Sequence, residues 1–405
     1  MNPPAAGTSQ FKRLSVLIAV AFVDMIGLMM VIPLLPFVAT DLGASPMMLG
    51  VLTSAFPVAQ LLSAPSWGRV SDRYGRRPAL LIGLIASMLA YVVFGAAHTI
   101  WLLLVSRLVQ GAGGGTTGVL NAYVADSIEP ADRAKALGWL SAATSAGVVV
   151  GPAIASGAAH FGQAAPGYFA ALLCAINAFF AWKWLPESRK QLGQSTAPKP
   201  VWHAASEILR HPTGLVPSLI WIYAGGMLAF TCLTALLGLY LKDEFQATAT
   251  TIGSYYSYIG VLSVLIRAVG LGPAIKYLGE LRGMRLGVVL LIAGMVLYPS
   301  AQSVWQLILV MPLVPMGTAL IFPTTTSLMS RYSDPSEIGM TMGVAQTYGG
   351  LARVVAPLLA AFMYQKISHA SPFFLGAGLV ALVGVIAVRL NPGPVPGPTP
   401  IGERA

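Results

Sequence analysis

The chain has 405 residues, of which 56% are hydrophobic and only 9% charged, and its formal net charge is +10. One soluble core of this length could not bury so much apolar surface, so the composition excludes an ordinary soluble protein and indicates a membrane protein. Most of the basic residues lie in short segments between apolar runs rather than on a polar domain, which excludes nucleic acid as the partner.

Apolar runs recur along the chain, and many are long enough to cross about 30 Å of hydrocarbon. Twelve runs meet this length criterion, to within several residues at each boundary. The sequence therefore predicts an all-α membrane protein with twelve transmembrane helices. They cover residues 14–38, 46–67, 78–97, 100–123, 136–158, 166–185, 214–240, 250–271, 285–301, 304–329, 339–364 and 372–390.

The first run contains Asp24 near its middle, and this is the only acid deep within any predicted helix. A charged residue at mid-bilayer costs about 2.5 to 3.5 kcal/mol, so it needs a partner, a water-filled cavity or a function. A carboxyl group can take up a proton from one side of the membrane and release it when a cation or water stabilises the charged form. We therefore predict that Asp24 is the protonation site.

The segment between the second and third runs, GRVSDRYGRRP at residues 68–78, concentrates charge. Gly75 allows a tight reversal of the chain, and the basic side chains suit phospholipid headgroups. Anchoring the topology is a sufficient role for Arg69 or Arg73 alone. It does not explain Asp72, because an acid adds nothing to a basic topology signal.

The fourth run contains Arg107 in SRLVQG, followed by GGGTTG at residues 113–118. Arg107 stays protonated and can supply a cation that competes for the Asp24 carboxylate; the alternative is a structural arginine that binds backbone groups. GGGTTG matches a dinucleotide-binding pattern, but no strand surrounds it, so we interpret its glycines as points of close helix contact. The fifth run carries GVVVGP, in which Gly147 and Gly151 allow close packing and Pro152 is expected to kink or soften the helix.

An internal repeat divides the chain. A shift of 204 residues superposes Gly75, Gly83 and Gly113 on later glycines at 279, 287 and 317, and glycines carry backbone information. The predicted organisation is a six-helix bundle at 1–186, a cytoplasmic linker at 187–212, a second six-helix bundle at 213–391 and a Pro/Gly-rich disordered tail at 392–405.

The substrate site is predicted only as a set of candidates that mixes flat aromatics with amides, as an amphipathic organic compound requires. Arg107, Arg267 and Arg353 lie in apolar runs against the single Asp24, which favours an anionic, zwitterionic or neutral compound. Arg267 and Arg353 could instead reach the interface or neighbouring carbonyls. The candidates are Asn121, Asn177, Tyr255, Tyr256, Tyr258, Gln346 and Arg353.

Orientation follows from the basic residues. If the N-terminus is cytoplasmic, only Lys242 and Lys366 of the 24 Lys and Arg residues lie in predicted outer loops. The positive-inside rule then predicts that both termini are cytoplasmic, with anionic membrane lipids as the nearest partners of the basic segments.

Four motifs carry a family resemblance. GRVSDRYGRRP resembles the loop between helices 2 and 3 of the major facilitator superfamily, and SRLVQGAGGG resembles its helix 4 motif. GVVVGP is similar to the antiporter motif of its drug/proton exchangers, and IGLMMVIPLLP to the helix 1 pattern of its twelve-helix drug exporters. The resemblance is nearest to tetracycline/proton antiporters and their multidrug relatives. It implies two bundles that alternate around a central site.

The resemblance also implies roles for particular residues. Asp24 and Arg107 would couple protons, and Gly147, Gly151 and Pro152 would form the antiporter motif. Tetracycline exporters carry an acid in helix 3 where this chain has Ala90, and helix 9 also lacks their second acid, which argues against tetracycline itself. The cytoplasmic gate would consist of Gly68, Asp72, Arg73, Gly75, Arg76, Arg77, Asp126 and Glu187.

The expected function is proton-coupled export of small amphipathic organic compounds across a bacterial inner membrane, by a monomer without cofactor or metal. A proton symporter that imports an organic anion has the same fold and is an alternative. A multipass lipid-processing enzyme is the other class. The five histidines stand apart in loops or near helix ends, whereas catalytic and metal sites need converging ligands, so the sequence favours transport.

Overall fold

The computed structural model describes residues 6–188, 214–334 and 337–391. All regular secondary structure within these residues is helical, and each of the twelve predicted runs coincides with a whole or a broken helix. The all-helical fold is therefore confirmed. Most of the predicted linker at 187–212 and the predicted disordered tail at 392–405 lie outside the described residues.

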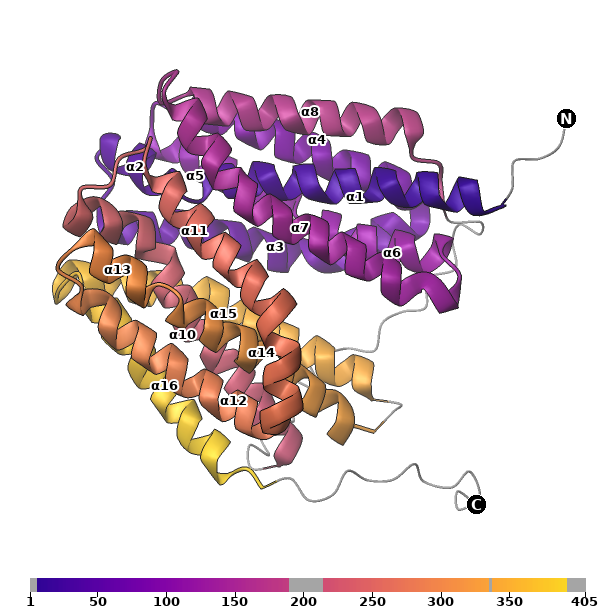
Figure 1. The fold of residues 1–405 in the computed structure, drawn as a ribbon. Coiled ribbons are helices and arrows are strands. Elements are labelled where there is room, and N and C mark those ends of the chain that lie inside the picture. Colours follow the sequence, from indigo (N-terminus) through magenta and orange to yellow (C-terminus); the bar gives the residue numbers. More distant parts are fainter. Residues whose placement is uncertain (1–5, 189–213, 335–336, 392–405) are drawn as a thin grey trace, which may run out of the picture. The chain divides into compact units, whose positions relative to one another are not determined.

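The first half of the chain folds into eight helical segments, because two of its six predicted runs are each broken into two helices. Pro33 and Pro36 follow α1, where proline limits continuation of the helix, and a glycine run separates α5 from α6. The segments are α1 (Ala6–Val31), α2 (Leu35–Asp41), α3 (Pro46–Tyr74), α4 (Arg76–Gly95), α5 (Ile100–Ala112), α6 (Thr116–Ser127), α7 (Pro130–Ala159) and α8 (Ala165–Trp184) (Figure 1). α7 continues through Pro152 as one helix.

The second half begins with a long helix and contains one π-helical turn, Ile266–Gly270, directly after α11. The backbone of Gly279 leaves the helical region inside α12 and so divides that helix. The segments are α10 (Leu215–Phe245), α11 (Ile252–Leu265), α12 (Leu271–Leu297), α13 (Val304–Val310), α14 (Leu313–Tyr332), α15 (Ile338–Lys366) and α16 (Ser371–Arg389).

Within the described residues, nine stretches are long and apolar enough to cross a membrane. The difference from the twelve predicted runs has three sources. α5 and α6 are each too short to span alone, Ile252–Ser300 holds two predicted runs in one continuous stretch, and α15 is not among the nine. The chain is a multipass membrane protein.

Equivalent glycines make equivalent contacts in the two halves, which supports the predicted repeat. A Cβ atom on Gly83 would lie 3.1 Å from the carbonyl oxygen of Gly113, and a Cβ atom on Gly287 would lie 2.9 Å from that of Gly317. Gly75 also has a positive φ, +104°, as residue 279 does at +75°. A side chain at these positions would separate the helices or strain the turn.

The described chain forms two compact units, whose boundaries differ from the predicted ones because Leu236–Val264 groups with the first half. The contacts explain this grouping. Ser257 Oγ on α11 donates to the carbonyl of Val149 on α7 at 2.8 Å. Lys242 on α10 contacts Thr40 and lies 3.8 Å from the Asp41 carboxylate at the end of α2. The division at residues 186 and 213 stays a prediction.

The glycine contacts predict a stability effect. Gly317→Ala places a methyl group 2.8 Å from Leu291 Cβ, so we expect the variant to lose about 1 to 3 kcal/mol of stability through overpacking. Gly378→Ala on α16 is the control, since nothing lies within 4 Å of its Cβ position. Thermal unfolding of both purified variants in detergent measures the difference, and equal melting temperatures would contradict the packing argument.

Candidate functional site

The candidate site begins where α7 packs against α1. A Cβ atom on Gly147 would lie 2.8 Å from Met25 Cβ, and one on Gly151 would lie 2.6 Å from Met29 Cβ. The two glycines are four residues apart and therefore share one face of α7. Because neither has a side chain, α7 lies directly against the turn of α1 that follows Asp24.

The sequence indicated that the glycine run at 113–115 lies inside one helix. The structure instead places it between α5 and α6. Side chains of α3 bind carbonyl groups at this break: Trp67 Nε1 donates to Ala112 at 2.6 Å, and Gln60 Nε2 donates to Gly114 at 3.1 Å. The close contacts expected of these glycines are present, since a side chain on Gly115 would overlap the Trp67 ring. The break makes Thr116 the first residue of α6.

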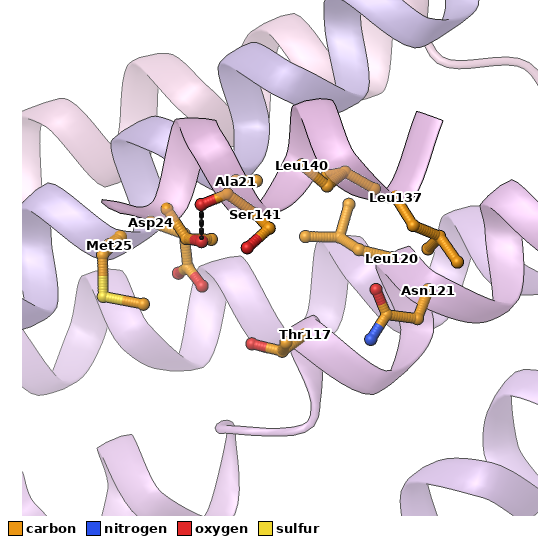
Figure 2. Close-up of a pocket in the computed structure, with 10 residues that line it drawn as sticks. Ala21, Asp24, Met25, Thr117, Leu120, Asn121, Leu137, Leu140 and Ser141 are labelled. Carbon is orange, nitrogen blue, oxygen red and sulfur yellow. Dashed lines mark hydrogen bonds between the residues drawn. The ribbon is translucent and has the colours of Figure 1, made fainter. Parts of the chain in front are cut away.

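Asp24 faces both this new helix start and a cavity. Its Oδ2 accepts a hydrogen bond from Thr116 Oγ1 at 2.9 Å. The cavity has a volume of about 210 Å³ and lies among α1, α6 and α7 (Figure 2). Asp24 is the one charged side chain among its lining residues, which are Ala21, Asp24, Met25, Thr117, Leu120, Asn121, Leu137, Leu140, Ser141 and Thr144.

The lining determines which chemistry the cavity can perform. Figure 2 shows Thr117 and Asn121 on α6, and Ser141 on α7, around the same space as the Asp24 carboxyl. Hydroxyl and amide groups can orient a polar ligand, while the leucine and methionine side chains accept its apolar part. A carboxylate among them can bind either a proton or a cationic group. The cavity therefore suits competition between protons and an amphipathic compound.

Arg107 does not line this cavity. Its side chain is 2% exposed, and its Cζ lies 5.6 Å from the centre of the Phe94 ring. Within the described part of the chain, Arg107 makes no ion pair with Asp24. Tyr91 of α4 interacts electrostatically with both residues. The two predicted coupling residues are therefore neighbours through Tyr91 rather than direct partners.

Among the predicted substrate residues, Asn121 lines this cavity and the others do not. Asn177 is buried, and its Nδ2 donates to the Val20 carbonyl at 3.1 Å, which fastens α8 to α1. Gln346 is exposed and Arg353 half-buried on α15, and Arg267 is exposed on the π-helical turn. The half-buried tyrosines on α11 are Tyr255, Tyr256 and Tyr258.

At the predicted cytoplasmic end, Arg76 joins two carboxylates. Its Nη1 lies 2.9 Å from Asp72 and also donates to Ser71 Oγ at 2.8 Å. Its Nε lies 2.7 Å from Asp126 Oδ2 on α6. Arg76 therefore ties the end of α3 and the start of α4 to the end of α6.

Glu187 caps the start of α4. Its carboxylate accepts hydrogen bonds from the backbone N–H groups of Arg76 at 2.9 Å and Arg77 at 3.1 Å, where the helix dipole favours negative charge. A side chain on Gly75 would overlap this carboxylate. The Arg77 guanidinium donates to the carbonyl of Trp182 near the end of α8.

The other two predicted gate residues lie apart from these contacts. Gly68 is exposed with nothing within 4 Å of its Cβ position, and exposed Arg73 stacks on its neighbour Tyr74 at 5.4 Å. The cluster therefore contains six of the eight predicted residues: Asp72, Gly75, Arg76, Arg77, Asp126 and Glu187.

The described residues contain no group of three or more His, Cys, Asp or Glu that could hold a metal ion. Both cysteines are buried, and each thiol donates to a backbone carbonyl, Cys174 to Leu84 and Cys232 to Ala356. These contacts are those of packing residues.

Comparisons with known proteins identify chains that are similar to this one in sequence and in fold. A family model described as Major Facilitator Superfamily matches residues 17–270 and 219–405. The class C tetracycline resistance protein of Escherichia coli is 28% identical over 87% of this chain and 90% of its own. Multidrug resistance protein 2 of Bacillus subtilis is 28% identical over 91% of this chain and 92% of its own length. The human organic anion transporter MFSD10 has the same fold, with a TM-score of 0.69 and 24% identity. The match covers 95% of this chain and 100% of the transporter.

The Arg76 contacts predict energetic coupling within the cluster at the predicted cytoplasmic end. We expect Arg76→Gln and Asp126→Asn to be non-additive by about 0.5 to 3 kcal/mol, because each variant breaks the same ion pair. A double-mutant cycle on the stability of the purified protein measures this coupling. The pair Arg69→Gln and Asp126→Asn is the control and should be additive, and additivity in both cycles would show that the ion pair has no energetic role.

Proposed function

Because this chain belongs to the major facilitator superfamily, we propose that it is a proton-coupled secondary transporter that exports small amphipathic organic compounds. Two relatives, a tetracycline resistance protein and a multidrug resistance protein, support export of drug-like compounds. Both are similar to this chain over about nine tenths of its length. The family is one of transporters, so a small-molecule substrate follows from membership.

The single observation that carries the proposal is the position of Asp24. Its carboxyl lies in a cavity that is lined by both hydroxyl or amide groups and aliphatic side chains. A proton and a compound that compete for this carboxyl cannot both occupy it. Exchange of one for the other would couple proton entry to compound exit, provided that the site opens to one side of the membrane at a time.

The cavity also bears on substrate charge. The count of arginines in the sequence favoured an anionic or zwitterionic compound, but Arg107 lies outside the cavity and Arg267 is exposed. Asp24 supplies its charge, and a carboxylate repels an anion where screening is weak. The site therefore supports a compound with a cationic or hydrogen-bonding group, and it gives no support to import of an organic anion.

The cytoplasmic cluster is the proposed gate. Asp72, Arg76 and Asp126 form ion pairs at the ends of three helices, and such pairs can be broken and remade as helix ends separate. The positive-inside distribution of Lys and Arg supports cytoplasmic termini in a bacterial inner membrane, with anionic lipids around the basic segments. We propose a monomer as the working unit.

Asp24→Asn tests proton coupling, because asparagine keeps the size of the side chain but cannot titrate. We expect uptake into inverted proteoliposomes, driven by an imposed pH gradient, to fall to background for a panel that includes tetracycline and tetraphenylphosphonium. Asp132→Asn, at an exposed position in the first turn of α7, is the control and should transport normally. Undiminished transport by Asp24→Asn would reject Asp24 as the coupling residue.

Asn121→Leu tests the cavity as the binding site. The change removes one hydrogen-bonding group from the lining, so the apparent KM of a transported compound should rise about two- to tenfold, the value of one net hydrogen bond. The pH at which transport is half-maximal should stay the same, since Asp24 is untouched. Transport kinetics over a range of concentrations and pH give both quantities, and an unchanged KM would place binding elsewhere.

A further inference from the structure

Three buried polar side chains lie outside the cavity lining and are linked to Asp24 through Tyr91. They are Tyr91 on α4 and Arg107 and Gln110 on α5, and their side chains are 1%, 2% and 2% exposed. Gln110 Nε2 donates a hydrogen bond to the Tyr91 hydroxyl at 2.8 Å. Buried polar groups are costly unless they are paired, so their gathering at one point calls for an explanation.

The Tyr91 hydroxyl reaches α1 one turn away from Asp24. A Cβ atom on Gly27 would lie 3.1 Å from the hydroxyl oxygen and 3.0 Å from Cε2 of the ring. Gly27 and Asp24 are three residues apart and share one face of α1. The absence of a side chain at residue 27 therefore lets the Tyr91 hydroxyl lie against α1, one turn from Asp24.

The hydrogen-bonding capacity of this group is only partly used. Gln110 donates to the phenolic oxygen, which leaves the hydrogen of Tyr91 available for a carboxylate acceptor. The Nε and Nη2 groups of Arg107 are buried and have no hydrogen-bond partner within the described residues, and Gln110 Oε1 has none either. An unpaired buried guanidinium is unfavourable. When a phenolic hydroxyl donates its hydrogen to an acceptor, its oxygen becomes a better acceptor for a second donor.

We propose that Tyr91 is a positioning residue whose hydroxyl donates to ionised Asp24, accepts from Arg107, and so links the protonation of Asp24 to Arg107. This inference rests on the proposed function, since it assigns Asp24 the coupling proton. When Asp24 is ionised, Tyr91 holds the guanidinium towards the carboxylate. When Asp24 is protonated, the Tyr91 hydroxyl loses its strong acceptor, and the hydrogen bond from Arg107 to the Tyr91 oxygen weakens.

Among the described residues, few other groups can link the protonation of Asp24 to a positive charge. Each helix packed around Asp24 and Tyr91 contributes side chains to their surroundings, and among these Arg107 on α5 carries the positive charge. α8 presents Cys174, whose thiol donates to the carbonyl of Leu84. α6 presents Thr116, and α7 presents the hydroxyls of Ser141 and Thr144.

An infrared titration of the Asp24 carboxyl tests the proposal without requiring transport. The band of the protonated acid is identified by its loss in Asp24→Asn, and its intensity is followed against pH in the purified protein. Tyr91→Phe removes only the hydroxyl, so the midpoint should move to higher pH by about one unit, a tenfold change in proton affinity. Tyr298→Phe is the matched control: this tyrosine is equally buried and donates within the other unit, and its midpoint should not move.

Gly27→Ala is a second variant that removes no polar group. Its methyl group would displace the Tyr91 hydroxyl, so the midpoint should move in the same direction as in Tyr91→Phe. If Tyr91→Phe does not fold, Gly27→Ala decides the matter. An unmoved midpoint in either folded variant overturns the proposal.

Transport separates this inference from the proposed function. Tyr91→Phe should keep downhill counterflow of a transported compound but reduce accumulation driven by a pH gradient, with the reduction about tenfold near neutral pH. Equal loss of both modes would indicate a purely structural role and overturn the proposal. If the wild-type protein moves no compound at all, the proposed function fails, while the infrared titration still tests the link between Tyr91 and Asp24.

Discussion

Keeping a carboxyl group inside the membrane is the constraint on which the rest of the first unit depends. An ionised acid at this depth costs about 2.5 to 3.5 kcal/mol unless the protein compensates it. Thr116 donates to Asp24, and Thr116 occupies that position because the glycine run ends α5 and α6 begins there. Gly147 and Gly151 bring α7 alongside, so the cavity forms at the acid. Local backbone breaks and close helix packing thus serve one side chain.

The same backbone devices recur at the end of the unit that carries the charged loop. Gly75 adopts a positive φ, and its lack of a side chain lets the Glu187 carboxylate reach the first N–H groups of α4. Arg76 then draws Asp72 and Asp126 together. In both places glycines let a carboxylate approach the start of a helix: Asp24 accepts from the hydroxyl of Thr116, and Glu187 accepts from the first backbone N–H groups of α4, where the helix dipole favours negative charge.

The sequence predicted the residues whose chemistry is unusual for their surroundings, such as Asp24 in an apolar run and Asp72 among arginines. It could not predict which way a side chain points. Asn121 lines the cavity whereas Asn177 binds a backbone carbonyl, since packing sets the rotation of each helix. The arginine count failed as a guide to the cavity for the same reason. Tyr91 carried no signal, because only tertiary contact places it beside Gly27. Gln110 belongs to the SRLVQG motif, so the sequence could have indicated it.

In the proposed mechanism, a proton and a transported compound exchange at Asp24. Proton release from the purified protein in weakly buffered detergent solution, on addition of tetraphenylphosphonium, measures that exchange most directly. We expect the wild-type protein to release protons in a saturable way that approaches one proton per protein molecule, and we expect no release from Asp24→Asn. Binding of the cation by the wild-type protein without proton release, or equal release from both proteins, would contradict it.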